Sequence, residues 1–373
     1  MLREFIPDEL ITEVLSFLPV KSLMRLKCLN KSWKTLISDP AFIKLHLKRS
    51  ARNKHLALFS RIQQTSYNFR VAPFRLHCLL ENTSGTITVP YFPINKDRVS
   101  LNVVGSCNGL FCLVGYYHTP TYINYKKILF YLWNPATRTL SNKIKFYCEN
   151  CFKWRVAFGY DNSTETYKIV VFNPESYEVS VFNFGGNNIW KNIQSFPVVL
   201  LPLDRVLASH GYRDVYAHVN DSLNWLVIRE ESQFVIISLD LSSETYRQLL
   251  PPQGFDKVSL VLPTLAMLMD SLCFCHDFNG TNFIIWQMKE FGVQESWIQF
   301  LKISYQDLPI VYNVCSRLPL FPLCLSENGD TLVLAWDRGK QAILYNTAEK
   351  TGYTDNCKWY GSKEYVESLV STC

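Results

Sequence analysis

Thiols and imidazoles are the side chains of this sequence whose grouping comes closest to a chemical site. Cys148 and Cys151 form a CxxC pair, and Cys273, Cys275 and His276 form a second compact cluster. Together they could supply the nitrogen and sulfur ligands that zinc prefers. The second cluster has CxC-H spacing, however, and alternation along a strand places its two thiols on one face and the imidazole on the other. The pattern therefore favours ordinary strand thiols over a zinc site.

A nucleophile is the second chemical possibility, and its candidate is Cys107. The stretch 105–109, Gly-Ser-Cys-Asn-Gly, has the outline of a nucleophile elbow. Asn-Gly followed by Leu-Phe-Cys-Leu is more typical of a two-residue hairpin turn. The sequence contains no zincin motif, phosphate loop, dinucleotide fingerprint or calcium loop. We therefore expect a non-catalytic chain with no metal and no cofactor.

The composition is that of a folded, strand-rich protein. Of the 373 residues, 48% are hydrophobic, 14% aromatic and 19% charged, which excludes a disordered chain and a coiled coil. The N-terminal stretch MLREFIPDEL lacks the apolar core of a signal peptide, and the 12 cysteines follow no disulfide framework. No stretch is apolar enough to span a membrane. These features favour free thiols in a reducing compartment, the cytoplasm or the nucleus, and no membrane partner.

The positive charge lies entirely at the N-terminus. Residues 1–55 hold 11 Lys/Arg and 5 Asp/Glu, so the remaining 318 residues hold 27 of each sign, and the net +6 arises before residue 56. A basic segment of this kind can bind nucleic acid. No aromatic residues interleave with these charges as stacking requires, so we expect a solvated helix face and linker, and no nucleic-acid partner. The basic stripe consists of Lys44, Lys48, Arg49, Arg52 and Lys54.

Three or four short helices are predicted within the first fifty residues. Pro7-Asp8-Glu9 is a helix start, followed by apolar residues at helical spacing up to Pro19. A second helix is predicted over Val20–Leu29, a third begins after the cap Asn30, and Asp39-Pro40 opens a fourth. So small a unit cannot bury all of its aliphatic surface internally. A partner surface is therefore implied.

From about residue 56 the helical period gives way to short apolar runs separated by turn residues. Two-residue sequences typical of turns recur at intervals of 53, 60, 49 and 58 residues; we call them turn marks. A polar residue recurs after each turn mark. Units of about fifty residues suggest four-stranded blades around an axis, hence a β-propeller; a pair of stacked sheets is the alternative. Six blades are favoured, with five or seven possible; residues 56–98 would supply the sixth and 365–370 close the ring. The turn marks are Asn108-Gly109, Asp161-Asn162, Asp221-Ser222, Asp270-Ser271 and Asn328-Gly329, and the polar marks are Asn134, Asn183, Asp240, Gln287 and Asn346.

The stretch from Ile6 to Leu47 resembles an F-box. The segments LPVKSL (18–23), KSW (31–33) and ISDP (37–40) fall in that motif's order and spacing; Ile6 and Asn30 depart from it, where Leu and Ser are usual. The resemblance implies docking onto a Skp-family adaptor, and through it onto a cullin and a ring-finger protein. By the same resemblance the adaptor-binding residues would be Pro7, Leu10, Val14, Leu15, Leu18, Pro19, Leu23, Leu26 and Trp33, although some must form the unit's own core.

The rest of the chain resembles the plant F-box-associated interaction domain, through GSCNGLFCL (105–113), LWNPATR (132–138), FGYDNSTETYKIVVF (158–172), VIISLDLSSETYRQLLPP (235–252) and IIWQMKEFGVQESWIQFLKI (284–303). Ser222 and Ser271 stand where this family often has Gly, which puts tight turns there in doubt. The resemblance implies an α+β multidomain protein: an F-box over 1–48, a basic linker over 49–55 and a propeller-like β domain over 56–373.

The resulting expectation is a substrate-recognition subunit of a Skp-cullin-F-box ubiquitin ligase. Its β domain would bind an unidentified target protein through rim loops such as 116–125, 184–189 and 251–257. A propeller lectin or protein trap with non-degradative attachment is one alternative, and an enzyme using Cys107 is another. The family also includes pollen-side F-box proteins of self-incompatibility, and the residues do not separate that subgroup from its relatives.

Overall fold

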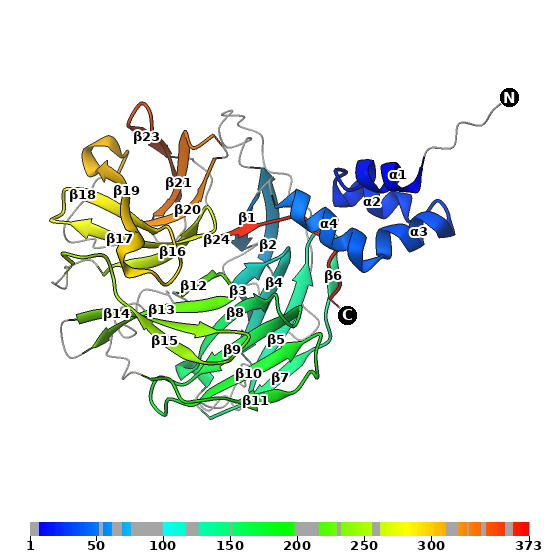
Figure 1. Cartoon of the computed structure of the whole chain (residues 1–373), viewed down its shortest axis with the longest axis horizontal. Helices are drawn as coiled ribbons and strands as arrows, with labels where there is room; N and C mark the ends of the chain where they lie inside the picture. The colour runs from blue at the N-terminus through cyan, green and yellow to red at the C-terminus, as the bar shows by residue number, and fades with distance from the viewer. Residues whose placement is uncertain are drawn as a thin grey trace.

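The computed structural model describes residues 7–51, 55–61, 69–75, 100–116, 127–149, 151–197, 216–229, 233–255, 262–310, 320–326, 328–336, 341–354 and 361–372. Within these ranges, four helices at the N-terminus precede six β-sheets (Figure 1). No helix in the described ranges is both long and apolar enough to cross a membrane.

The helical unit, residues 7–51, consists of α1 (Asp8–Leu15), α2 (Val20–Leu26), α3 (Lys31–Ser38) and α4 (Pro40–Ser50). Asn30 accepts a 2.8 Å hydrogen bond from the Trp33 amide, and Asp39 accepts one of 2.8 Å from the Ala41 amide. The predicted starts of the third and fourth helices are therefore confirmed. The second helix ends three residues earlier than predicted, because the amides of Cys28 and Leu29 bond to the carbonyls three residues back and form a tighter turn.

Blades 2 to 6 are each built from consecutive antiparallel strands, with the first strand innermost. Blade 2 contains β3 (Ser100–Cys107), β4 (Leu110–Tyr116), β5 (Lys127–Asn134), β6 (Thr139–Leu140) and β7 (Ile144–Tyr147); blade 3 contains β8 (Arg155–Asp161), β9 (Thr166–Phe172), β10 (Val179–Phe184) and β11 (Trp190–Asn192). Blade 4 contains β12 (Tyr216–Val219), β13 (Ser222–Arg229), β14 (Gln233–Asp240) and β15 (Tyr246–Leu249). Blade 5 contains β16 (Thr264–Leu268), β17 (Ser271–Phe278), β18 (Asn282–Met288) and β19 (Trp297–Ser304); blade 6 contains β20 (Phe321–Leu325), β21 (Thr331–Trp336), β22 (Gln341–Asn346) and β23 (Thr351–Thr354). The 3₁₀ helices η1 (Cys151–Lys153), η2 (Gln294–Ser296) and η3 (Tyr305–Asp307) lie between strands.

Blade 1 combines both ends of the β region. It contains β1 (His55–Arg61), β2 (Phe69–Arg75) and β24 (Gly361–Tyr365), and β1 pairs antiparallel with both of the others. The closing strand thus ends at Tyr365, where the predicted closing stretch 365–370 begins, and residues 366–370 have a different role described below. The apolar run at 85–89, expected to belong to this blade, lies outside the described residues.

The innermost strands form a closed circle. Each of β3, β8, β12, β16, β20 and β24 contacts the next, and β24 contacts β3 again. Apolar side chains fill the spaces between neighbouring blades; for example, Val156 and Phe158 of blade 3 pack with Phe130 and Leu132 of blade 2. The fold is therefore a six-bladed propeller, as favoured from the repeat pattern, attached to a helical unit.

Tight turns connect the first two strands of several blades. The turn residues Asn220 and Asp221 have φ of 44° and 60°, and Met269 and Asp270 have φ of 51° and 57°. Positive φ at both central residues is what a type I′ turn requires. The doubt raised by serine at positions 222 and 271 was wrong, because each turn lies one residue earlier and the serines begin β13 and β17.

The second repeat mark corresponds to a side-chain cap at the end of a third strand. The Oδ1 atoms of Asn134, Asp240 and Asn346 each accept hydrogen bonds from the amides two and three residues further on. Such a cap stabilises the turn that follows the strand. This explains why a short polar side chain recurs there in three blades.

A buried charge network joins blades 3 and 4. Lys168 on β9 is 4% exposed; its Nζ lies 3.3 Å from Asp161 Oδ2 and 3.3 Å from Glu244 Oε1, and donates to the Leu241 carbonyl. Glu244 also pairs at 2.7 Å with the exposed Lys191. Every residue of β9 is buried, so the Lys168 ammonium cannot reach water. Acceptors from two blades, blade 3 and blade 4, bind it instead.

Candidate functional site

The first helix and the turn that follows it carry two apolar stripes, and each residue of the second stripe comes one position after its counterpart in the first. Leu10, Val14 and Phe17 are 55%, 64% and 65% exposed. The neighbouring stripe, Ile11, Leu15 and Leu18, faces inward, and Leu15 is 5% exposed within the unit's core. Helical geometry places residues at i, i+4 and i+7 on one face, so the exposed stripe is continuous. A continuous exposed apolar stripe of this kind marks an interaction site.

The nine predicted adaptor-binding residues fall into three groups. Pro7, Leu10, Val14 and Pro19 are exposed. Leu15 and Leu23 are buried and form the unit's core together with Val20, Ile37 and Phe42. The remaining three, Leu18, Leu26 and Trp33, are half-buried at the edge of that core. The structure thus makes the division that the sequence left open.

Phe17 was absent from the predicted set, although its position three residues after Val14 continues the exposed stripe. Its ring lies 4.0 Å from the Arg49 guanidinium carbon, and Arg49 also donates to the Glu13 carbonyl at 2.7 Å and pairs with the Glu13 carboxylate. His46 on the same helix reaches the Leu18 carbonyl at 3.0 Å, and burial lowers its pKa so that the ring is neutral. Helix α4 therefore fixes the far end of α1.

Two of the five cations of the predicted basic stripe form ion pairs with carboxylates. Lys44 forms an ion pair with Glu165 in the β8–β9 turn, and Arg49 pairs with Glu13. Lys48 is exposed, and Arg52 and Lys54 lie outside the described residues. Two of the five cations thus hold the helical unit together or tie it to the propeller.

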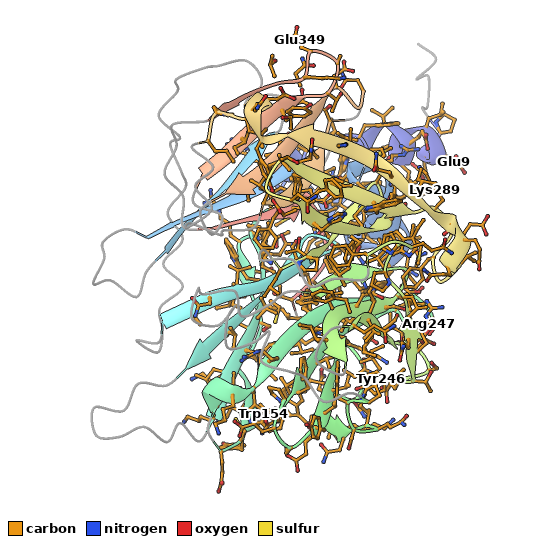
Figure 2. All side chains as sticks on the ribbon, turned by 90° about the vertical axis from the view of Figure 1, so that its left-hand side faces the viewer. Glu9, Trp154, Tyr246, Arg247, Lys289 and Glu349 are labelled. Carbon is orange, nitrogen blue, oxygen red and sulfur yellow. The ribbon has the colours of Figure 1, made fainter. Side chains whose placement is uncertain are left out.

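The propeller has two ends, defined by strand direction. The first and third connections within each blade lie at one end, and the second connections lie at the other. Ala136 after β5 packs against the helical unit's core, and Glu165 after β8 pairs with Lys44, so the helical unit sits at the first end. Figure 2 shows Glu9 of α1 at the upper right and Trp154, between β7 and β8, near the bottom of the molecule. The second end therefore faces away from the helical unit.

The three predicted rim loops do not share one end. Residues 184–189 join β10 to β11 and lie at the helical unit's end, whereas Tyr116 begins a connection at the opposite end, with 117–125 outside the described residues. The third loop, described to residue 255, partly packs between blades 4 and 5. Gln294 donates to the Pro251 carbonyl at 2.9 Å, and the centre of the Phe255 ring lies 4.9 Å from that of Phe274. The free end instead presents the β9–β10 turn at 173–178 and the exposed rings of Tyr147 and Phe278.

Cys107 lies in a polar cluster that its sequence neighbours did not reveal. Its sulfur is 3.7 Å from Nδ1 of His218, which comes from blade 4, 111 residues away. Burial, reinforced by the Asp221 charge, raises the Cys107 pKa to about 12, and burial lowers the His218 pKa. The pair is therefore a neutral thiol beside a neutral imidazole, the opposite of an activated nucleophile. His218 Nε2 instead lies 3.3 Å from the Tyr160 amide on the edge of β8, as the Tyr216 hydroxyl lies 2.9 Å from the Phe158 amide.

The cysteines of the two predicted clusters also follow the structural interpretation. Cys273 and Cys275 are buried on one face of β17, whereas His276 lies on the other face, where Trp286 donates to it at 3.2 Å. The alternation predicted for this strand is confirmed. The Sγ atoms of Cys148 and Cys151, just after β7 of blade 2, are 2.8 Å apart. The hydrogen bond from Cys148 lowers the Cys151 pKa. No group of three metal-binding side chains comes together in the ranges described above.

Asn224, which precedes Trp225 on β13, is a structural residue. Its side-chain amide donates at 3.1 Å to the carbonyls of Ala217 and Ser222, on either side of the β12–β13 turn. It is fully buried. The side chain therefore holds a turn whose two central residues have positive φ and no glycine.

Comparison with known proteins adds two family matches and several relatives. Residues 60–372 match the F-box associated beta propeller domain, and residues 5–45 match the F-box domain. An F-box/kelch-repeat protein of Arabidopsis thaliana is 29% identical over 80% of this chain and 79% of its own length; the F-box protein CPR1 of the same plant is 25% identical over 99% and 89%. Among solved structures, apo AztD from Citrobacter koseri has a TM-score of 0.42 and 10% identity over 85% of this chain and 84% of that chain, too distant a likeness to argue from.

Proposed function

Because this chain belongs to the F-box proteins that carry an F-box associated β-propeller domain, we propose that it is the substrate-recognition subunit of a Skp-cullin-F-box ubiquitin ligase. The family is typically non-catalytic, and the neutral Cys107–His218 pair is consistent with that. Ubiquitin transfer would then belong to the other subunits. The chain's contribution would be to hold a target near the ubiquitin donor, which raises the effective concentration of target lysines.

The exposed stripe on α1 is the observation that carries this proposal. Leu10, Val14 and Phe17 expose more than half of their side chains to water, and none of them belongs to the apolar core of the helical unit. We assign these three residues, with the exposed Pro7 and Pro19, as the anchors for a Skp-family adaptor. Leu15 and Leu23 act indirectly, because they hold the helices that present the anchors.

The target-binding role is assigned to the propeller end that faces away from the helical unit. There the β9–β10 turn and the rings of Tyr147 and Phe278 are exposed on a rigid frame. The working division is an F-box over 1–48, a linker over 49–55 and a target-binding domain over 56–373. Cullin and ring-finger subunits would join through the adaptor, in the cytoplasm or the nucleus.

A pull-down of the full chain against a panel of Skp-family adaptors tests the proposal. The diagnostic variant is Leu10→Ala/Val14→Ala, since both side chains are exposed and neither is part of the core. The matched control is Leu250→Ala/Val293→Ala, which removes the same residue types from propeller positions that are 43% and 40% exposed. We expect the diagnostic variant to bind about 30-fold more weakly or worse, and the control to bind normally.

Two outcomes would overturn the proposal. Failure of the unaltered chain to bind any adaptor would remove the receptor role. Unchanged binding by the diagnostic variant would remove α1 as the adaptor site. A variant combining Leu10 with Leu15 and Leu23 is unsuitable, because the two buried leucines would unfold the unit and abolish binding for another reason.

A further inference from the structure

The last described residues, 366–372, form an extended stretch that we call the C-terminal segment. It follows β24 directly and runs between the propeller and the helical unit (Figure 1). Although it contains no helix or strand, Ser368, Leu369 and Thr372 are only 0%, 6% and 1% exposed. A terminal stretch is usually loose unless something holds it. The contacts on its two sides identify what holds this one.

One side of the C-terminal segment completes the helical unit. Leu369 packs in the same apolar cluster as Leu15, Val20 and Leu23. Glu367 Oε2 accepts a hydrogen bond from the Val20 amide at 3.3 Å, across 347 residues of sequence. Helix α2, which begins at Val20, has no side-chain cap of its own. The helical unit thus takes a core residue and a helix-capping acceptor from the far end of the chain.

The other side of the C-terminal segment is fastened to blade 2. The side-chain amide of Asn134, at the end of β5, donates to the carbonyls of Ser368 at 3.0 Å and Val370 at 2.9 Å. The β3–β4 turn approaches closely as well: a Cβ on Gly109 would lie 2.3 Å from Ser368 Oγ and 2.6 Å from the Val366 carbonyl oxygen. Asn134 itself is fully buried. The segment is therefore inserted into the propeller surface rather than resting on it.

The other described links between the two parts are weaker. The Lys44–Glu165 ion pair joins side chains that are 59% and 57% exposed, and such pairs contribute little. Residues 52–54, between α4 and β1, lie outside the described ranges. Ala136 adds a single methyl contact to the helical unit's cluster. Among the described residues, Glu367 and Leu369 thus supply a hydrogen bond and a buried apolar side chain to the helical unit, from a segment that Asn134 holds on the propeller.

We infer that the C-terminal segment fixes the orientation of the helical unit on the propeller, with Glu367 and Leu369 as its positioning residues. The two parts meet through a seven-residue wedge held by apolar packing on one side and by Asn134 on the other. For the receptor function proposed above, on which its use in ubiquitin transfer rests, this wedge sets the separation between the adaptor site on α1 and the free end of the propeller. Neither residue needs to touch adaptor or target.

Single-molecule energy transfer within the full chain tests the inference without any adaptor. One fluorophore is attached at position 29, between α2 and α3, and the other at position 176, in the β9–β10 turn, through two genetically encoded reactive residues; both native side chains are exposed. The test variants are Glu367→Ala/Leu369→Ala and deletion of residues 366–373. The control is Leu268→Ala in blade 5, a leucine of similar burial at 2% exposure whose cluster does not include the helical unit.

We expect one narrow distribution for the unaltered chain and for the control, and a distribution at least twice as wide for both test variants. Hydrogen exchange at the Val20 amide should accelerate about tenfold in the double variant, because its acceptor is lost. Near-ultraviolet circular dichroism shows whether the propeller stays folded, and if the deletion unfolds it, the double variant decides. An unchanged width in a folded double variant would overturn the inference, whereas loss of adaptor binding alone would affect only the proposed receptor function.

Discussion

Helix α1 and strand β9 break the usual distribution of polar and apolar residues in opposite directions. On α1 and in the turn after it, Leu10, Val14 and Phe17 are more than half exposed, whereas β9 buries the charged Lys168 almost completely. Leucine is among the residue types most often fully buried, and lysine among those least often. Each exception therefore needs a physical reason.

The difference lies in what surrounds each element. In the propeller every blade has two neighbours, so a buried ammonium can be met by Asp161 from its own blade and Glu244 from the next. The helical unit has a covered side and an open side, and Leu10, Val14 and Phe17 on the open side lie outside its apolar cluster. Polar residues inside the propeller thus complete the chain's own structure, whereas the apolar residues on the open side of the helical unit form the surface that we propose as the adaptor site.

The largest expected effect comes from breaking the buried network. Lys168→Ala leaves Asp161 without its buried partner, so we expect a loss of about 3–5 kcal/mol in the free energy of unfolding. Lys191→Ala, at a position 69% exposed, should cost about 1 kcal/mol or less. Urea unfolding followed by circular dichroism measures both. Equal losses would mean that burial does not distinguish the two lysines.

Truncating the core of the helical unit should give the next largest effect. Leu23 is 0% exposed, so Leu23→Ala should lower the stability of the unit by about 2–5 kcal/mol. Leu10→Ala, on the open side, should change stability by about 0.5 kcal/mol or less. Hydrogen exchange of the helical peptides separates these cases. If Leu10→Ala proved as destabilising as Leu23→Ala, the stripe would be part of the core.

The continuation of the stripe predicts an effect on binding without one on stability. Phe17→Ala should weaken binding to a Skp-family adaptor by about 2 kcal/mol, as expected for an aromatic anchor. Isothermal titration calorimetry measures the affinity, and Met269→Ala, which removes a 60% exposed side chain from the propeller, is the control. Normal adaptor affinity in Phe17→Ala would restrict the interface to the first two turns of α1.

Acid should weaken the propeller through Asp161. Burial alone would raise the Asp161 pKa, but hydrogen bonds from Ser163 and Thr164 outweigh it and lower the pKa to about 2, from an ordinary 3.8. The folded state therefore favours the carboxylate, and this contribution, about 2 kcal/mol, is present above pH 4 and lost as the pH falls toward 2. Melting temperatures measured from pH 5 to pH 2.5 should fall less steeply in Asp161→Asn. If the melting temperatures of the unaltered chain and of Asp161→Asn fell equally steeply with pH, the lowered pKa of Asp161 would be contradicted.

The smallest effect concerns a helix cap. Asn30→Ala removes the acceptor for the Trp33 amide and should cost about 1 kcal/mol, whereas Asn30→Ser keeps an acceptor and should be nearly neutral. Hydrogen exchange, measured at rising temperature on the helical unit within the full chain, compares Asn30→Ala with Asn30→Ser. A neutral Asn30→Ala would show that packing alone sets the start of α3.

Local patterns predicted much of this fold, because helix starts, hairpin turns and a repeat of about fifty residues are written in neighbouring residues. Asn30, Asp39 and the marks at Asn134 and Asp240 all act where their spacing indicated. Within α1 the pattern was ambiguous, since the stripes through Leu10 and Leu15 both have helical spacing, and only tertiary packing decides which one is covered. The nine-residue adaptor set was therefore a mixture of surface and core.

Long-range pairings lay beyond local patterns. His218 meets Cys107, and Glu367 meets Val20, from positions far apart in the sequence. The ring closes through Gly361–Tyr365, a stretch whose composition alone gives no indication of its partner. Each of these contacts depends on the complete propeller bringing distant segments together, so a single sequence carries little signal for them.

The pairing of β1 with β24 has a consequence for how the chain matures on the ribosome. Strand β1 is made early, yet its partner comes about 300 residues later, so the edge of β1 stays unpaired while blades 2 to 6 are synthesised. An unpaired edge in a nascent chain is a template for wrong association, and closure over so long a separation is slow. Cellular yield of this protein should therefore depend on chaperones that shield the nascent chain until its last residues emerge.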